Sequence, residues 1–156
     1  MTGAIDARLK DLGIELPAAA PPAANYVPYV VSRGQVFVSG QVPVGSDGKL
    51  HFQGKVGKKF SVEEGQEAAA LCALNILAQA KAACDGDLDR VVRCVKLGGF
   101  VNCTKKFDQH PAVINGASDM MVAVLGEKGR HARFAVGASN LPFNVAVEID
   151  AVFEIA

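Results

Sequence analysis

The spacing of hydrophobic and polar residues changes along the chain, and the changes indicate where strands and helices begin. From residue 145 onward, apolar side chains occupy every second position, as a strand with one buried face requires. The residues of this face are Val145, Val147, Ile149, Ala151 and Phe153. Similar strand patterns cover 26–32, 35–44 and 89–102, and Arg33-Gly34 predicts a tight turn after the first of them.

The apolar run at 132–136 predicts a further strand, which the Leu-Pro turn joins to the last one as an antiparallel hairpin. Arg133 and Glu148 both fall on the face of this hairpin that points away from the core. They lie at equal distances from the midpoint at 140–141, so the hairpin predicts that they are near neighbours across the two strands. On these residues alone, the simplest interpretation is a cross-strand ion pair worth roughly 0.2–1 kcal/mol.

Three segments show the helical period instead. Residues 4–12 carry one apolar helical face. Ser61 and Glu64 have the spacing of a capping box, and the alanine- and leucine-rich stretch that follows continues a helix to the "CDGD" sequence. Pro111 suits the first position of another helix, for which Gly126 is a natural stop.

The order of these elements is β-β-(β)-α-β-α-β-β. It predicts an α+β sandwich with a mixed sheet of about six strands and both long helices on one face. A sheet covered on one side only predicts an oligomer that buries the other side. The chain of 156 residues suits one domain, and we assign 25–156 to it. Residues 1–24 form an N-terminal extension, a short helix followed by a Pro/Ala connector.

The composition excludes several classes of protein. Sixteen basic residues balance sixteen acidic ones, and no basic cluster exists beyond 55–59, so a general electrostatic grip on nucleic acid is not predicted. The N-terminus is charged where a signal peptide needs an apolar run, and no apolar stretch approaches membrane-spanning length, so we expect a soluble cytoplasmic protein. The cysteines show no C-x-x-C pair and the three histidines stand alone, which predicts reduced thiols and no metal site. The cysteines are Cys72, Cys84, Cys94 and Cys103.

Several short motifs follow one another in a recognisable order: "NYVPYVVS", "FVSGQVPV", "INGASD", "ARFAVGASNLP" and "VAVEIDAVFE". In this order, over roughly 25–156, the chain resembles the reactive intermediate deaminase family, also called the Rid or YjgF family and labelled endoribonuclease L-PSP or translation inhibitor. The resemblance implies a chorismate-mutase-like fold and a homotrimer with a central barrel, with active sites in the clefts between subunits. It also implies hydrolysis of 2-imino acids, which arise from enamines, to 2-oxo acids and ammonia without a cofactor.

The resemblance also implies roles for individual residues. Arg133 matches the arginine that holds the substrate carboxylate, and Glu148 matches the glutamate proposed to position water. Both roles suit the chemistry, because guanidinium binds carboxylate bidentately and a carboxylate can accept a proton from an attacking water. The other matching positions, which imply substrate contacts, are Tyr29, Ser39, Gly40 and Asn115. Outside the pattern, Tyr29 would be interpreted as an ordinary strand aromatic and Ser39-Gly40 as a bulge or bend in a strand. Asn115 would be interpreted as an exposed helical polar residue or a turn-stabilising side chain.

The chain also departs from the family pattern. Ala135 stands where many members carry a cysteine, which excludes a thiol mechanism at that position. The segments 1–24 and 45–60 look longer than in compact members, and we expect them to line or narrow the cleft. Three functions remain open: an imine deaminase, a trimeric protein that binds small carboxylates without chemistry, and a ribonuclease. The neutral charge and the lack of a basic, aromatic-rich face argue against the third.

Overall fold

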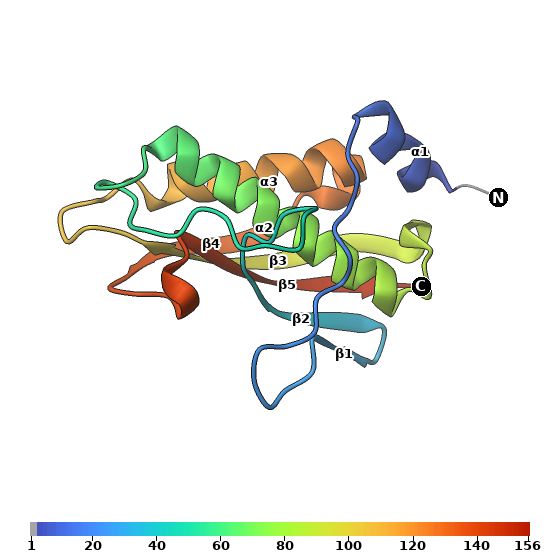
Figure 1. Cartoon of the computed structure of the whole chain (residues 1–156). Helices are drawn as coiled ribbons and strands as arrows, with labels where there is room; N and C mark the ends of the chain where they lie inside the picture. The colour runs from blue at the N-terminus through green and yellow to red at the C-terminus, as the bar shows by residue number, and fades with distance from the viewer. Residues whose placement is uncertain (1–2) are drawn as a thin grey trace.

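The computed structural model describes residues 3–156. Three α-helices and five strands make up the described chain (Figure 1). In chain order they are α1 (Ala4–Asp11), β1 (Tyr29–Ser32), β2 (Gln35–Gln41), α2 (Val62–Ala83), β3 (Val91–Asn102), α3 (His110–Leu125), β4 (Ala132–Ala138) and β5 (Val147–Ile155). Short 3-10 turns at Leu88–Arg90, Gly126–Gly129 and Pro142–Asn144 connect some of them.

The strands form one mixed sheet in the order β1-β2-β5-β3-β4, in which only β3 and β4 run parallel. Both long helices cover the same face of this sheet, as predicted (Figure 1). The sheet has five strands rather than about six. The segment after β2 contributes only isolated bridges such as Val44 with Leu50, because its glycines and turns interrupt the pairing.

The predicted C-terminal hairpin is wrong. β4 and β5 are consecutive in the sequence, but β3 lies between them and pairs with both. The eight residues 139–146 carry the chain over the end of β3 and include one 3-10 turn. β5 takes the central place because Val147, Ile149 and Phe153 are all fully buried, whereas β4 alternates between exposed and half-buried residues and suits an edge.

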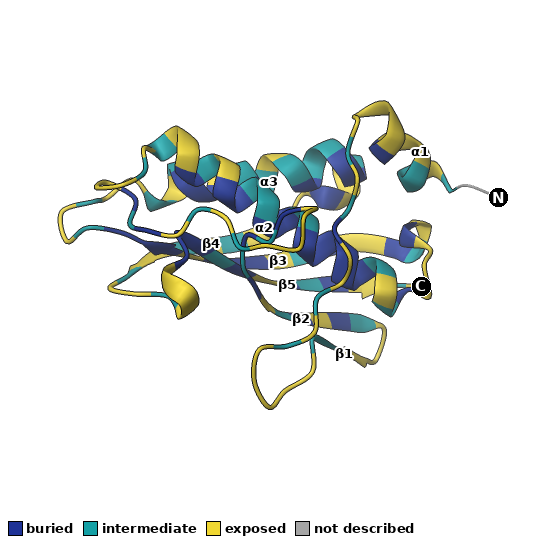
Figure 2. Cartoon of the chain, in the orientation of Figure 1, coloured by how far each residue is buried: buried dark blue, intermediate teal, exposed yellow. Residues whose placement is uncertain are grey.

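The core lies between the sheet and the two long helices (Figure 2). α2 approaches the sheet closely because its buried face carries small side chains, with Ala68, Ala69, Cys72, Ala73 and Ala80 all fully buried. The four cysteines are free and buried, as predicted for thiols that pack as small hydrophobic groups. Simple alternation fails in β3, where Val91, Cys94 and Leu97 all face the core. Two register shifts against β5 move the pattern by one residue each.

The predicted capping box begins α2. Ser61 Oγ accepts the backbone N–H of Glu64 at 3.1 Å, and the Glu64 carboxylate accepts the backbone N–H of Ser61 at 3.1 Å. Because the cap satisfies otherwise unpaired donors, we expect Ser61→Ala to lower the free energy of unfolding by about 1 kcal/mol. Urea denaturation measures this, and Ser61→Asp, which restores an acceptor, should recover most of the loss. Equal stability of all three proteins would contradict the prediction.

The N-terminal helix α1 is attached to the domain by polar contacts with the turn before β3 and with α2. The Asp89 carboxylate accepts the backbone N–H groups of Ala4 and Ile5 at 2.8 and 2.9 Å, and these hydrogen bonds lower the pKa of Asp89. Lys81 forms an ion pair with Asp6 at 2.9 Å. Leu9 is buried in the core, so the extension packs onto the domain as a fixed part of it.

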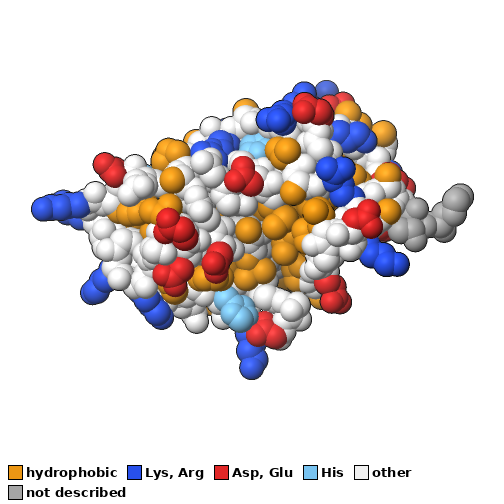
Figure 3. All heavy atoms as spheres, turned by 90° about the horizontal axis from the view of Figure 1, so that it is seen from above, with side chains coloured by type: hydrophobic (Ala, Val, Ile, Leu, Met, Phe, Trp, Pro, Cys, Tyr) orange, Lys and Arg blue, Asp and Glu red, His pale blue; other side chains and the backbone are white. Residues whose placement is uncertain are grey.

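The two faces of the sheet differ in character. On the helical side, Lys and Arg side chains lie mainly toward the rim of the molecule, and Asp and Glu side chains lie among apolar ones across the middle (Figure 3). The face away from the helices exposes large apolar side chains to between 36% and 44%, namely Phe37, Phe100, Phe134 and Val136. A group of this kind marks an interaction surface in a protein of this size. Among residues 3–156, no helix is long and apolar enough to cross a membrane.

Candidate functional site

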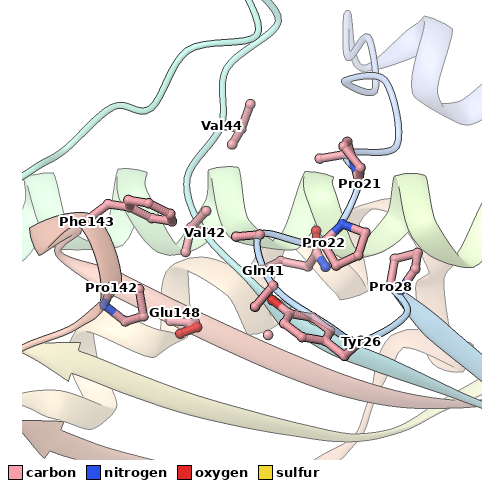
Figure 4. Close-up of a pocket in the computed structure, with 14 residues that line it drawn as sticks. Pro21, Pro22, Tyr26, Pro28, Gln41, Val42, Val44, Pro142, Phe143 and Glu148 are labelled. Atoms are coloured by element: carbon pink, nitrogen blue, oxygen red, sulfur yellow. The ribbon is translucent and has the colours of Figure 1, made fainter.

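Glu148 and Gly40 both line a pocket of about 380 Å³, and Figure 4 shows the Glu148 side chain in it. Glu148 alternates with the buried Val147 and Ile149 of β5, so its side chain points away from the helices. A register shift in β2 between Val38 and Gln41 bends Gly40 toward it. A side chain at Gly40 would place its Cβ 2.8 Å from Glu148 Oε2, so glycine lets the Glu148 side chain lie in this position, and a larger residue would displace it.

The pocket around Glu148 is mainly apolar, and this environment changes the chemistry of the carboxyl group. Burial raises the pKa of Glu148, and the negative charge of Asp150 raises it further. In the described part of the chain, no hydrogen bond engages the Glu148 carboxylate. A carboxyl group that is partly desolvated, unpaired and open to a pocket is suited to exchange a proton with a bound molecule.

Ser39 and Tyr29, two predicted substrate contacts, have structural partners. Ser39 Oγ donates to the carbonyl of Val27 at 2.8 Å, and its backbone N–H donates to the carbonyl of Pro28 at 2.9 Å. Tyr29 pairs with Val38 and packs against the core, so within one chain it lies outside the Glu148 pocket. The tyrosine that lines this pocket is Tyr26.

Arg133 and Asn115 share a second depression, between β4 and α3. The Arg133 guanidinium donates to Ser118 Oγ and to the carbonyl of Pro111, both at 3.0 Å, so its plane is held in place. His131 Nε2 lies 2.8 Å from the same Ser118 oxygen. Burial lowers the pKa of His131, and the charge of Arg133 contributes in the same direction. This shift disfavours the charged form of His131, so Arg133 and Arg130 are the permanent cations of this depression, which Asp119 also lines.

Arg133 and Glu148 are not neighbours, so the predicted adjacency and the cross-strand ion pair are both wrong. Arg133 aligns with Leu97 on one side of β3, and Glu148 aligns with Phe100 on its other side. Two strand spacings and three residues separate them, roughly 14 Å between Cα atoms. Arg133 points toward α3, whereas Glu148 points away from the helices. One subunit cannot present both side chains to the same small molecule.

The segment 1–24, which we expected near the cleft, does contribute residues 20–24 to the Glu148 pocket, but sequence reasoning missed the other residues that shape this pocket. Its other lining residues are Ala20, Pro21, Pro22, Ala23, Ala24, Tyr26, Pro28, Gln41, Val42, Val44, Pro142 and Phe143. Phe143 has a left-handed backbone (φ 59°), which is unusual for a bulky residue and is often found at functional sites. The sequence feature that could have indicated Phe143 as a pocket residue is its position directly after Leu-Pro in a turn. The segment 45–60, which we expected near the cleft, does not line this pocket.

Residues 6–154 match the family model described as "YjgF/chorismate_mutase-like, putative endoribonuclease". The chain belongs to the YjgF family. The resemblance inferred from the motifs is therefore confirmed, together with the α+β, chorismate-mutase-like fold.

Three relatives show how far the similarity extends. Protein TCP17 of Trypanosoma cruzi is 52% identical over 155 residues, which cover 99% of this chain and 96% of that protein. The crystal structure of Atu1372 from Agrobacterium tumefaciens, a protein of unknown function, is 53% identical with a TM-score of 0.91, covering 97% of this chain and 92% of that one. RidA from an Antarctic Psychrobacter is 27% identical with a TM-score of 0.62, covering 88% and 94%.

Proposed function

We propose that the protein hydrolyses 2-imino acids to 2-oxo acids and ammonia, at a site formed between subunits. The observation that carries this proposal is the Glu148 carboxyl group. It stands at the family's glutamate position, beside the close-packed Gly40, in a pocket that raises its pKa. Arg133, in the second depression, is the group proposed to hold the substrate carboxylate.

The separation of Arg133 from Glu148 supports an oligomeric site. A neighbouring copy that brings its own Arg133 depression to the Glu148 pocket would supply the missing half, and we propose the homotrimer with a central barrel for this purpose. The apolar side chains on the open face of the sheet, such as Phe100 and Phe134, suit the centre of such an assembly. Each trimer would then hold its sites in the clefts between subunits.

The proposed reaction needs positioning and proton transfer. A protonated imine nitrogen makes C2 of the substrate electrophilic. Glu148 orients a water and accepts one of its protons while the oxygen–C2 bond forms. The protonated Glu148 then returns this proton to the nitrogen of the resulting carbinolamine. The C2–N bond breaks to release ammonia, and loss of the hydroxyl proton to solvent leaves the 2-oxo acid. One water is consumed, and no redox change occurs.

Two other functions have less support. The family description includes endoribonuclease, but the walls of the Glu148 pocket are mostly apolar and their ionisable carboxyl group would repel phosphate. A protein that only binds small carboxylates would need the Arg133 depression and not the desolvated glutamate.

The proposal is tested by generating 2-iminobutyrate and 2-iminopropionate with an amino acid oxidase and measuring ammonia and 2-oxo acid release. We expect the wild-type protein to accelerate release over buffer and to have the mass of a trimer in light scattering. No acceleration with any imino acid would reject the catalytic proposal, and a monomer would reject the intersubunit site.

The raised pKa of Glu148 predicts a pH profile. If the ionised carboxylate is the base, kcat/KM should rise with pH through an apparent pKa above the ordinary value of about 4.3 for glutamate. Because the charge of Asp150 helps to raise the pKa of Glu148, Asp150→Asn should shift this rise to lower pH. The conservative Asp150→Glu should shift it little. An unchanged profile in Asp150→Asn would show that Glu148 does not control the acidic limb.

A further inference from the structure

We propose that the pocket beside Glu148 is a subsite for an apolar substrate side chain, and that the enzyme prefers imino acids with bulky aliphatic chains. This inference rests on the proposed function and adds a substrate class to it. The walls of the pocket come from two segments far apart in the sequence, the connector at 20–28 and the turn that carries Phe143. In Figure 4, Pro142 and Phe143 lie on one side of Glu148, and Tyr26 lies on the other.

The size and lining of the pocket suit such an occupant. Its volume of about 380 Å³ falls within the usual range for small-molecule sites, which are mostly apolar with a few polar groups. Proline, alanine, valine and aromatic side chains form most of the surface, and Glu148, Gln41 and the Tyr26 hydroxyl supply its polar side chains. A substrate with C2 near Glu148 would direct its carboxylate toward the neighbour's Arg133 and its side chain toward these walls.

The connector is held in place as a preformed wall. Gln79, a buried residue of α2, donates from Nε2 to the carbonyl of Ala20 at 2.7 Å. At the other end, Ser39 holds the carbonyls of Val27 and Pro28. Proline at 21, 22 and 28 restricts the backbone between these anchors. Since little freedom remains to be lost, binding of an apolar group against this wall costs little ordering.

The opposite wall is also fixed, although its backbone is strained. Phe143 and Asn144 both have left-handed backbones, with φ of 59° and 58°. Gln53 Nε2 donates to the carbonyl of Phe143 at 2.9 Å, and the N–H of Gly54 donates to the carbonyl of Asn144 at 2.7 Å. The turn therefore holds an aromatic ring that remains 55% exposed beside Glu148. A large apolar ring held in this way provides contact area for an apolar ligand group.

The test compares two imino acids generated in place by an amino acid oxidase, one from leucine and one from alanine. We expect wild-type kcat/KM to be about 10-fold or more higher for the leucine-derived substrate, since each buried methylene contributes substantially to selectivity. Phe143→Asn removes the ring while keeping a residue that tolerates the left-handed backbone, and should bring the ratio toward one. Leu12→Ala, which truncates another exposed apolar residue that lies outside the pocket, should leave the ratio unchanged.

The outcomes separate this inference from the function on which it rests. Turnover of both substrates with equal or reversed preference would overturn the subsite and leave the deaminase intact. Wild-type preference that persists in Phe143→Asn, with an unchanged melting temperature, would also overturn it. Failure to turn over either substrate above buffer would reject the proposed function itself.

Discussion

Arg133→Ala is expected to lower kcat/KM for 2-imino acids by about 100-fold or more, mainly through a higher KM. Removing one partner of a charge-assisted, bidentate contact commonly costs about 2–5 kcal/mol in binding. The guanidinium is held by Ser118 and by the carbonyl of Pro111, so its orientation toward a ligand is set before binding. Steady-state kinetics on the imino acids measure the effect.

Two controls make the Arg133 prediction specific. Arg133→Lys keeps the charge but loses the planar pair of donors, so it should fall between wild type and alanine. Arg130→Ala removes an exposed cation from the same depression, and its partner Glu127 is exposed as well. The decrease in kcat/KM should therefore be small. Equal losses in Arg130→Ala and Arg133→Ala would indicate general attraction of anions. Melting temperatures show whether a variant has been destabilised by losing the packing of β4 against α3.

Glu148→Gln is expected to lower kcat by about 10²- to 10⁴-fold with little change in KM, because an amide of the same shape cannot accept a proton from water. The thermal stability of Glu148→Gln, in contrast to its activity, should increase. A carboxyl group whose pKa is raised on folding stabilises the protein below its unfolded pKa, and this contribution is lost as the pH rises through the folded pKa. At neutral pH the ionised side chain is therefore unfavourable, and the amide should raise the melting temperature.

This combination distinguishes catalysis from a structural role. A residue needed for the fold would lose activity and stability together, whereas Glu148 should lose only activity when it is replaced by glutamine. Asp150→Asn serves as the matched control, because Asp150 lies two positions along the same strand on the same face. It should retain most of the activity at neutral pH. An active Glu148→Gln would remove Glu148 from the mechanism.

The local elements could be predicted from the sequence because each depends on neighbours a few residues away. The capping box of Ser61 and Glu64 forms as expected, and the turn at Arg33 and Gly34 has the two positive φ angles that a tight hairpin needs. The buried face of the last strand also agrees with its alternation of apolar residues. In β3 the same reasoning fails in part, because bulges depend on the partner strand.

The candidate site was only partly predictable. Gly40 and Glu148 do meet, and Arg133 and Asn115 share a depression, yet the two pairs lie apart. The motif order identified the residues but contained no information on which strand lies between them. Tyr26 and Phe143 were missed because an aromatic residue in a loop has no periodic pattern that marks it as part of a pocket.

The sequence by itself determined the helices, most of the strands, the family and the identity of the charged residues that we propose for catalysis. Periodicity, caps and turn residues are local, and the motifs are read directly from the chain. Only the tertiary structure decided that β3 lies between β4 and β5, that Arg133 and Glu148 face opposite sides of the sheet, and that Tyr26 and Phe143 line the same pocket as Glu148. An apolar strand face specifies burial but not a partner, so strand order depends on long-range packing of the whole chain.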